Sequence, residues 1–246
     1  MEPIYQLSFS VDALHTDRFG RLKASSILYL VQEAAGRHWQ HIEGQTGQHC
    51  GLYWVIIRHR VQVTRLPRKG ENIRVETWPM PTTRVAYPRS VVAYDGQNRE
   101  LFRSISLWVL MDPESRAMVL PGKSGVMVPG ILRGNELPSP QSLAPASLSA
   151  DMARMVRFTD LDSNGHMNNA RYLDWLADLL PSGFHSSHTI RDMTLGYVAE
   201  ALEGDTLQQQ WQLDENGHLR LEILRPGGEK NHRIFSADVQ FGTELP

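Results

Sequence analysis

The sequence contains the same order of predicted elements twice, and this internal repeat restricts the possible folds. Each half begins with a strand, continues with an apolar helix and ends with four strands. The first half is predicted to contain a helix at 24–38 and strands at 4–10, 53–64, 72–78, 84–94 and 101–111. The second half is predicted to contain a helix at 168–180 and strands at 152–158, 189–199, 206–213, 218–224 and 233–241.

The strands of each half are expected to pair antiparallel. The dipeptides Asp95-Gly96 and Asn216-Gly217 are strong hairpin turns between neighbouring strands. Apolar residues cover most of the surface of the first helix, which is typical of a buried helix. A long twisted sheet can curl around such a helix. The sequence therefore predicts an α+β fold, a tandem (double) hotdog in which each half is an antiparallel sheet wrapped around a long apolar helix.

A proline-rich stretch separates the two halves. Six prolines fall between residues 113 and 145, where no regular element is expected. The predicted domains are residues 1–112, which we expect to bind an acyl chain, and residues 152–246, which we expect to be catalytic. Residues 113–151 are predicted to form an irregular linker.

Composition narrows the functional classes. The net charge of −2 argues against a nucleic-acid-binding protein, which is usually basic. The single cysteine, Cys50, can form neither an internal disulfide nor a thiolate metal site. The sequence has no signal-like start and no apolar run long enough to span a membrane, so a cytoplasmic location is expected. The pairs His38/His41 and His185/His188 lack a suitably spaced carboxylate, so we expect neither a metal nor another cofactor.

The stretch 159–172 carries the most informative chemistry. Asp162, Asn164 and His166 stand at alternate positions, and alternate side chains of an extended segment share one face. A carboxylate, an amide and an imidazole are therefore expected to converge on one substrate. Asn168 is a credible N-cap for the following helix, whose first amides can receive developing negative charge. The alternative is that these residues form only a turn that caps the helix.

This stretch resembles the active-site loop of the acyl-acyl-carrier-protein thioesterases. The family pattern D-x-N-x-H-x-N-N-x-x-Y reads here DSNGHMNNARY, and MTLGYVAE at 193–200 resembles the downstream strand with a catalytic glutamate. The helix and strands of the first half resemble the family as well, so the likeness spans nearly the whole chain. It implies a tandem hotdog. Plant members have a plastid transit peptide. No such segment is recognised in this sequence, so we expect a member of the bacterial type.

The resemblance implies a thiolester hydrolase that releases free fatty acid from fatty acyl-acyl-carrier protein and so terminates fatty-acid synthesis. The catalytic residues it implies are Asp162, Asn164, His166 and Glu200, and the substrate-binding residues are Asn168, Asn169 and Tyr172. Many plant members carry a cysteine after the glutamate, where this chain has Ala201. We therefore expect water to attack, with His166 as the base or proton shuttle. Asp162 either orients the site or attacks the thioester itself and forms an anhydride.

The repeat also predicts where the chemistry is absent. A shift of 145 residues aligns Asp17 with Asp162, while Phe19 and Arg21 replace Asn164 and His166. A shift of 134 residues places Leu66 opposite Glu200. We therefore expect one active site per chain, in the second half.

The expected partner is acyl carrier protein, whose phosphopantetheine arm holds the acyl chain. Carrier proteins are acidic, and residues 58–103 hold ten Lys and Arg against four Asp and Glu. The docking hypothesis uses Arg58, Arg60, Arg65, Arg68 and Lys69. The alternative is a basic strand edge that prevents aggregation.

Three other functions remain open at this point. The chain can be a hotdog thioesterase of acyl-coenzyme A, a catalytically silent acyl-binding protein or, less favoured, a dehydratase of 3-hydroxyacyl thioesters. A tandem hotdog can be a monomer or a homodimer.

Overall fold

The computed structural model describes residues 3–47, 51–227 and 231–243. Cys50 lies outside the described residues. The chain divides into two compact units, unit 1 (Met1–Pro140) and unit 2 (Gln141–Pro246). The division falls within the stretch that was expected to be the linker.

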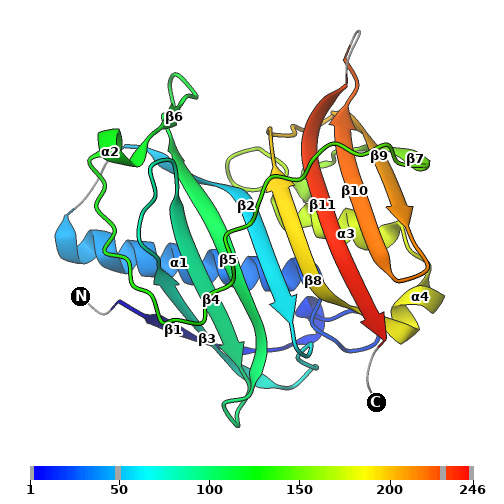
Figure 1. Ribbon diagram of the computed structural model, residues 1–246, viewed down its shortest axis with the longest axis horizontal. Helices are drawn as coiled ribbons and strands as arrows, with labels where there is room; N and C mark the ends of the chain where they lie inside the picture. Colours follow the sequence, from blue (N-terminus) through cyan, green and yellow to red (C-terminus); the bar gives the residue numbers. More distant parts are fainter. Residues whose placement is uncertain (1–2, 48–50, 228–230, 244–246) are drawn as a thin grey trace. The chain divides into compact units, whose positions relative to one another are not determined.

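Unit 1 is an antiparallel sheet with a long helix against one face (Figure 1). Its strands lie in the order β1-β3-β4-β5-β2, and β6 pairs with β5. The strands are β1 (Tyr5–Ser10), β2 (Tyr53–Val63), β3 (Asn72–Pro79), β4 (Tyr87–Tyr94), β5 (Glu100–Met111) and β6 (Met118–Val119). The helices are η1 (Ala13–His15), α1 (Ala24–Thr46) and α2 (Pro121–Ser124).

Helix α1 is longer than predicted and is buried along its length. Val31 and Ala34 are fully buried, and Ile42 continues the same apolar stripe beyond the predicted end. The helix stops at Gly47, whose φ of 67° suits glycine and whose amide donates to the carbonyl of Glu43 at 2.8 Å. The predicted burial of this helix is thus confirmed.

Unit 2 has the same kind of architecture. Its strands lie in the order β8-β11-β10-β9-β7 and pair antiparallel. The strands are β7 (Ala150–Met155), β8 (His188–Tyr197), β9 (Thr206–Leu213), β10 (His218–Arg225) and β11 (His232–Thr243). The helices are η2 (Phe158–Asp160), α3 (Arg171–Asp178) and α4 (Ser182–Ser187). Trp175 of α3 and Phe235 of β11 are fully buried in its core.

The prediction for unit 2 placed the ends of two elements wrongly and missed one helix. Helix α3 covers only the middle of the predicted 168–180. A turn at Asn168 precedes its start, and beyond its end Pro181 lacks an amide hydrogen and disfavours helical backbone before it. Strand β7 ends at Met155, and the segment that follows turns into η2. The short helix α4 was not predicted. Both predicted hairpins, β4–β5 and β9–β10, are confirmed.

The two units repeat each other residue by residue around one turn. Bridge partners Thr16 and Leu22 in unit 1 correspond to Leu161 and Met167 in unit 2, which confirms the shift of 145. Arg21 bridges to Arg68, whereas His166 bridges to Leu202, which confirms the shift of 134 for the second partner. Leu66 therefore occupies in unit 1 the position of Glu200 in unit 2.

Candidate active site

A tight turn built on Asp162 presents the loop that carries His166. The Asp162 Oδ1 atom accepts hydrogen bonds from the amides of Asn164, at 2.8 Å, and His166, at 3.3 Å. The Asp162 amide donates to the carbonyl of His166 at 2.8 Å, and Gly165 has the positive φ of 78° that closes the turn. One oxygen of the Asp162 carboxylate therefore holds the backbone of the loop.

This turn corrects the expectation that the segment is extended. Asp162, Asn164 and His166 do not share a face by strand alternation, because the backbone reverses between Asp162 and His166. Asn164 is exposed at the tip of the turn, whereas His166 is half-buried. The three side chains are close along the chain, but they face different surroundings.

The structure brings His166 and Glu200 together. The His166 Nε2 and Glu200 Oε2 atoms are 3.3 Å apart, and the two side chains are 18% and 36% exposed. The backbone joins the two segments, because the amide of Met167 donates to the carbonyl of Ala201 at 2.8 Å. A carboxylate beside an imidazole can orient the ring and stabilise its protonated form.

The prediction that Asn168 caps helix α3 was wrong. The helix begins at Arg171, its N-cap is Ala170, and no side chain caps it. Asn168 Oδ1 instead accepts from the amide of Ala170 at 2.9 Å, and the amide of Arg171 donates to the carbonyl of Asn168. Asn168 forms a turn of its own, because this short side chain bonds readily to an amide two residues on.

Tyr172 and Asn169 both contact Tyr197. The Tyr172 ring is 3% exposed, stacks on Phe235 with 4.5 Å between centroids and meets Tyr197 edge-on. The hydroxyl of Tyr197 donates to the carbonyl of Asn169 at 3.2 Å. Burial raises the pKa of both tyrosines above the ordinary value. These contacts brace the start of α3 against the sheet of unit 2.

Sequence patterns did not identify Tyr197 or Arg225 as neighbours of this site. The Arg225 Nη2 atom donates to the carbonyl of Glu200 at 2.7 Å. Tyr197 lies in the stretch that resembles the family, but only its packing singles it out. Arg225 belongs to no recognisable motif, because its contact depends on the path of the 198–205 turn beside β10.

The equivalent position in unit 1 has different chemistry. Arg21, in place of His166, binds the Asp17 carboxylate through Nε at 2.9 Å and Nη2 at 2.8 Å. Leu66, in place of Glu200, offers no carboxylate. An imidazole–carboxylate pair is therefore present at the unit 2 position and is replaced at the unit 1 position.

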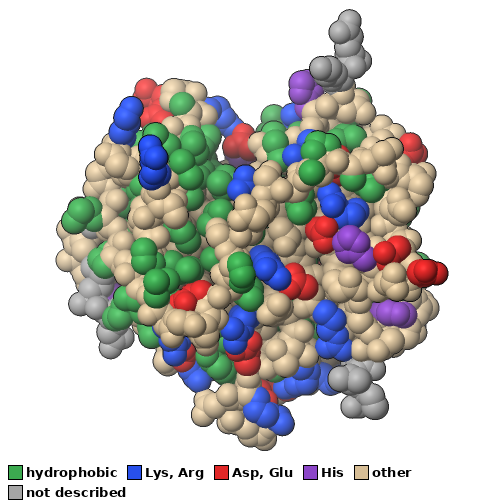
Figure 2. Space-filling model, in the orientation of Figure 1, with side chains coloured by type: hydrophobic (Ala, Val, Ile, Leu, Met, Phe, Trp, Pro, Cys, Tyr) green, Lys and Arg blue, Asp and Glu red, His purple; other side chains and the backbone are tan. Residues whose placement is uncertain are grey.

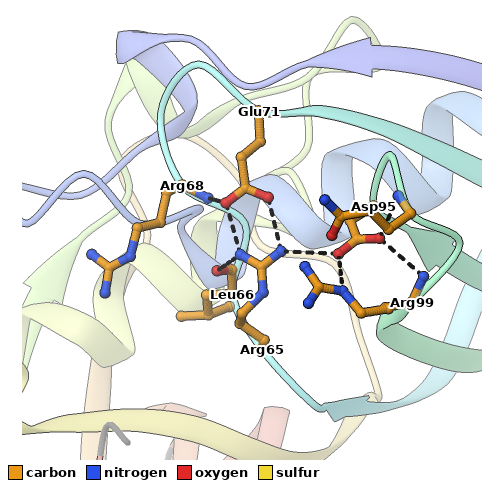
Figure 3. A network of polar contacts seen from close by, with 7 residues as sticks. Arg65, Leu66, Arg68, Glu71, Asp95 and Arg99 are labelled. Carbon is orange, nitrogen blue, oxygen red and sulfur yellow. Dashed lines mark hydrogen bonds and ion pairs between the residues drawn. The ribbon is translucent and has the colours of Figure 1, made fainter. Parts of the chain in front are cut away.

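The predicted docking residues differ in their surroundings. Arg58 and Arg60 are half-buried on β2, and Arg68 and Lys69 are exposed. Arg65 is held by Glu71, with Nη1–Oε1 and Nη2–Oε2 distances of 2.7 and 2.8 Å, and Asp95 lies 3.6 Å away (Figure 3). These hydrogen bonds raise the pKa of Arg65 and balance its charge. Figure 2 shows basic and acidic side chains interspersed on the face it presents.

Two kinds of feature are absent from the part of the chain that the structure describes. No group of three or more His, Cys, Asp and Glu side chains there is arranged to hold a metal ion. No helix there has both the length and the apolar character needed to cross a membrane.

Two family models match the sequence. The acyl-ACP thioesterase N-terminal domain matches residues 2–120, and the acyl-ACP thioesterase C-terminal domain matches residues 146–240. The chain belongs to the acyl-ACP thioesterase family. The resemblance read from the active-site loop is thereby confirmed.

Plant enzymes are among the curated relatives. The chain is 27% identical over 217 residues to the chloroplastic dodecanoyl-[acyl-carrier-protein] hydrolase of Umbellularia californica, covering 80% of this chain and 56% of the relative. It is 24% identical over 222 residues to a chloroplastic palmitoyl-acyl carrier protein thioesterase of Gossypium hirsutum, covering 83% of this chain and 54% of the relative. The chain thus spans little more than half the length of these relatives.

Solved structures share the fold. An acyl-ACP thioesterase from Bacteroides thetaiotaomicron superposes with a TM-score of 0.81 at 24% identity, covering 98% of both chains. The 12:0-ACP thioesterase from Umbellularia californica gives a TM-score of 0.81 at 21% identity, covering 99% of both chains. The predicted tandem hotdog is confirmed by these likenesses.

Proposed function

We propose that this chain hydrolyses fatty acyl-acyl-carrier protein to free fatty acid and carrier protein, the reaction that terminates fatty-acid synthesis. The observation that carries the proposal is the His166–Glu200 pair, which lies beside a turn with the family's active-site pattern. Membership of the acyl-ACP thioesterase family supports the same reaction.

In the proposed mechanism, water attacks the thioester carbonyl. The imidazole of His166 accepts a proton from the water and returns it to the departing thiolate, so one C–O bond forms and one C–S bond breaks. The carboxylate of Glu200 orients the ring and stabilises the imidazolium. Asn164 is exposed at the tip of the same turn, and its side-chain amide is proposed to bind the thioester or the water.

We assign Asp162 an orienting role. Its Oδ1 atom accepts two amide hydrogen bonds, and both amides belong to residues of the proposed catalytic set. A carboxylate that holds its own loop fixes the position of the imidazole. These contacts favour orientation over attack by Asp162 on the thioester. Asn168, Asn169 and Tyr172 are proposed to shape the neighbouring substrate surface.

The carrier protein is proposed to dock on the exposed and half-buried cations of unit 1, Arg58, Arg60, Arg68 and Lys69, with Arg65 bracing them through Glu71. Unit 1 is proposed to hold the acyl tail. The single cysteine supports action in a reducing compartment, and we propose the cytoplasm.

The direct test is thiol release from acyl-acyl-carrier proteins of several chain lengths, measured beside the matching coenzyme A esters. We expect preferential release from carrier protein. The His166→Ala variant should lower turnover about 10²–10⁴-fold, because it removes the proton acceptor.

Each other outcome contradicts a specific part of the proposal. Preference for coenzyme A esters would overturn the partner and keep the chemistry. Near-normal turnover of His166→Ala would remove the proposed base. Absence of release from either carrier would favour an acyl-binding protein.

A further inference from the structure

One guanidinium group holds the turn that carries Glu200. Arg225 Nη2 donates to the carbonyl of Glu200 at 2.7 Å and to Asp205 Oδ2 at 2.6 Å. The same carboxylate oxygen accepts from the amide of Leu202 at 2.9 Å. Arg225 and Asp205 thus clamp both ends of the 200–205 segment, and we call these contacts the Arg225 clamp.

The Arg225 clamp adds to backbone hydrogen bonds that join the same segment to Val156 and Met167. Strand β8 ends at Tyr197, so Glu200 lies outside the ladder of the sheet. The Glu200 side chain is 36% exposed, which means that packing alone does not fix its carboxylate. Because Leu202 bridges to His166, the clamped segment also contacts the backbone of the residue that carries the imidazole. Movement of this segment would change the distance between His166 and Glu200.

Arg225 is the last residue of β10, and its side chain reaches this segment. The register of β10 against β11 shifts directly before Arg225, and the extra residue at this shift is Ile234 of β11. Bulges are common beside active sites.

Unit 1 contains a comparable clamp without catalytic groups. Arg65 Nη1 donates to the carbonyl of Leu66 at 3.4 Å and to Glu71 Oε1 at 2.7 Å, and that oxygen accepts from the amide of Arg68 at 2.7 Å (Figure 3). By the shift of 134, Glu71 corresponds to Asp205 and Leu66 to Glu200. The bond to the carbonyl is short only in unit 2, where the clamped residue carries a carboxylate.

We propose that Arg225 is a positioning residue for the thioesterase reaction, which holds Glu200 at the distance from His166 that proton transfer requires. This inference rests on the proposed function. It assigns Arg225 no contact with substrate, because the clamp binds the backbone carbonyl of Glu200 and the Asp205 carboxylate.

The test is a double-mutant cycle that combines Arg225→Gln with Glu200→Gln, read as kcat and KM for acyl-acyl-carrier protein. Arg225→Gln should lower kcat about 10–100-fold with little change in KM, since small displacements of a catalytic group cost this much. In the Glu200→Gln background the same change should cost less than about twofold, because the carboxylate to be positioned is gone. Arg225→Lys should recover part of kcat, since one nitrogen makes both bonds.

Matched variants separate positioning from folding. Asp205→Asn and Asp17→Asn each weaken a carboxylate that accepts from an arginine side chain and a backbone amide, the first in unit 2 and the second in unit 1. Both should lower the urea midpoint of unfolding, but only Asp205→Asn should lower kcat. Asp205→Asn also keeps the test decisive if Arg225→Gln does not fold.

An equal loss of kcat in both backgrounds, or unchanged kcat in Arg225→Gln, would overturn the positioning role. A loss of kcat in Asp17→Asn equal to that in Asp205→Asn would overturn it as well. Failure of the proposed function is seen separately, as absence of thiol release by the wild-type chain.

Discussion

At the scale of single residues, a row of polar side chains crosses the buried sheet of unit 1. His59 of β2 and Arg89 of β4 are both register partners of Ser106 on β5, so all three share one face. Arg89 reaches α1, where it donates to His38 Nδ1 at 3.1 Å, and burial lowers its pKa to about 10. Burial lowers the pKa of His59 to about 3. Near neutral pH, Arg89 is charged and His59 is neutral.

This burial predicts a pH dependence of stability. The unfolded chain protonates His59 below its ordinary pKa of 6.5, whereas the folded chain resists protonation until about pH 3. Stability is therefore lost as the pH falls through this window, by about 1.4 kcal/mol per pH unit from this group. The free energy of unfolding, measured with urea at pH 7, 6 and 5, should change less with pH in His59→Leu than in the wild-type protein. An equal pH dependence of the free energy of unfolding in the two proteins would contradict burial of His59 in its neutral form.

At the scale of elements, one kind of turn recurs four times in the described residues. Its aspartate accepts from the amides two and four residues on, and the residue three positions on has a positive φ. The aspartates are Asp17, Asp95, Asp162 and Asp214. The positive-φ position is Gly20, Gly165 and Gly217 in three turns and Asn98 in the remaining one. The loop of the candidate site is thus a common structural turn that carries the proposed catalytic side chains.

The paired turns of Gly165 and Gly20 provide a matched test. Both glycines have a positive φ and open space where the Cβ atom of an alanine would lie, so alanine would be strained only by its backbone. Gly165→Ala and Gly20→Ala should each lower the free energy of unfolding by about 1–2 kcal/mol. Only Gly165→Ala should also lower kcat, because its turn carries His166. Equal kcat values in the two variants would argue against the Asp162 turn as the element that positions the imidazole.

At the scale of the whole molecule, periodicity and the repeat predicted most of the fold. Strand and helix patterns, hairpin dipeptides and the two shifts are local signals, and the antiparallel pairing followed from them. The His166–Glu200 pair was predicted from a motif and is observed. The tight turn at Asp162 and the Arg225 clamp were missed, because both depend on backbone hydrogen bonds that composition does not encode. The packing of Tyr172 against Phe235 was missed for the same reason.

Docking of an acidic carrier on unit 1 predicts salt dependence. Raising the ionic strength should increase KM for acyl-acyl-carrier protein, because salt screens the attraction between exposed charges. Lys69→Gln should raise KM at low salt, whereas Lys123→Gln, which removes the same charge from an exposed position outside the proposed surface, should not. Independence of KM from salt, or equal effects of the two variants, would exclude electrostatic docking at this surface.

The turn of unit 1 has a consequence for protein engineering. Its backbone already follows the path that presents an imidazole in unit 2, with Asp17 as the anchor and Gly20 at the reversal. A second catalytic centre would therefore need new side chains at Phe19, Arg21 and Leu66, rather than a new loop. Unit 1 therefore offers a second scaffold, on which chemistry could be installed while the proposed centre in unit 2 is left unchanged.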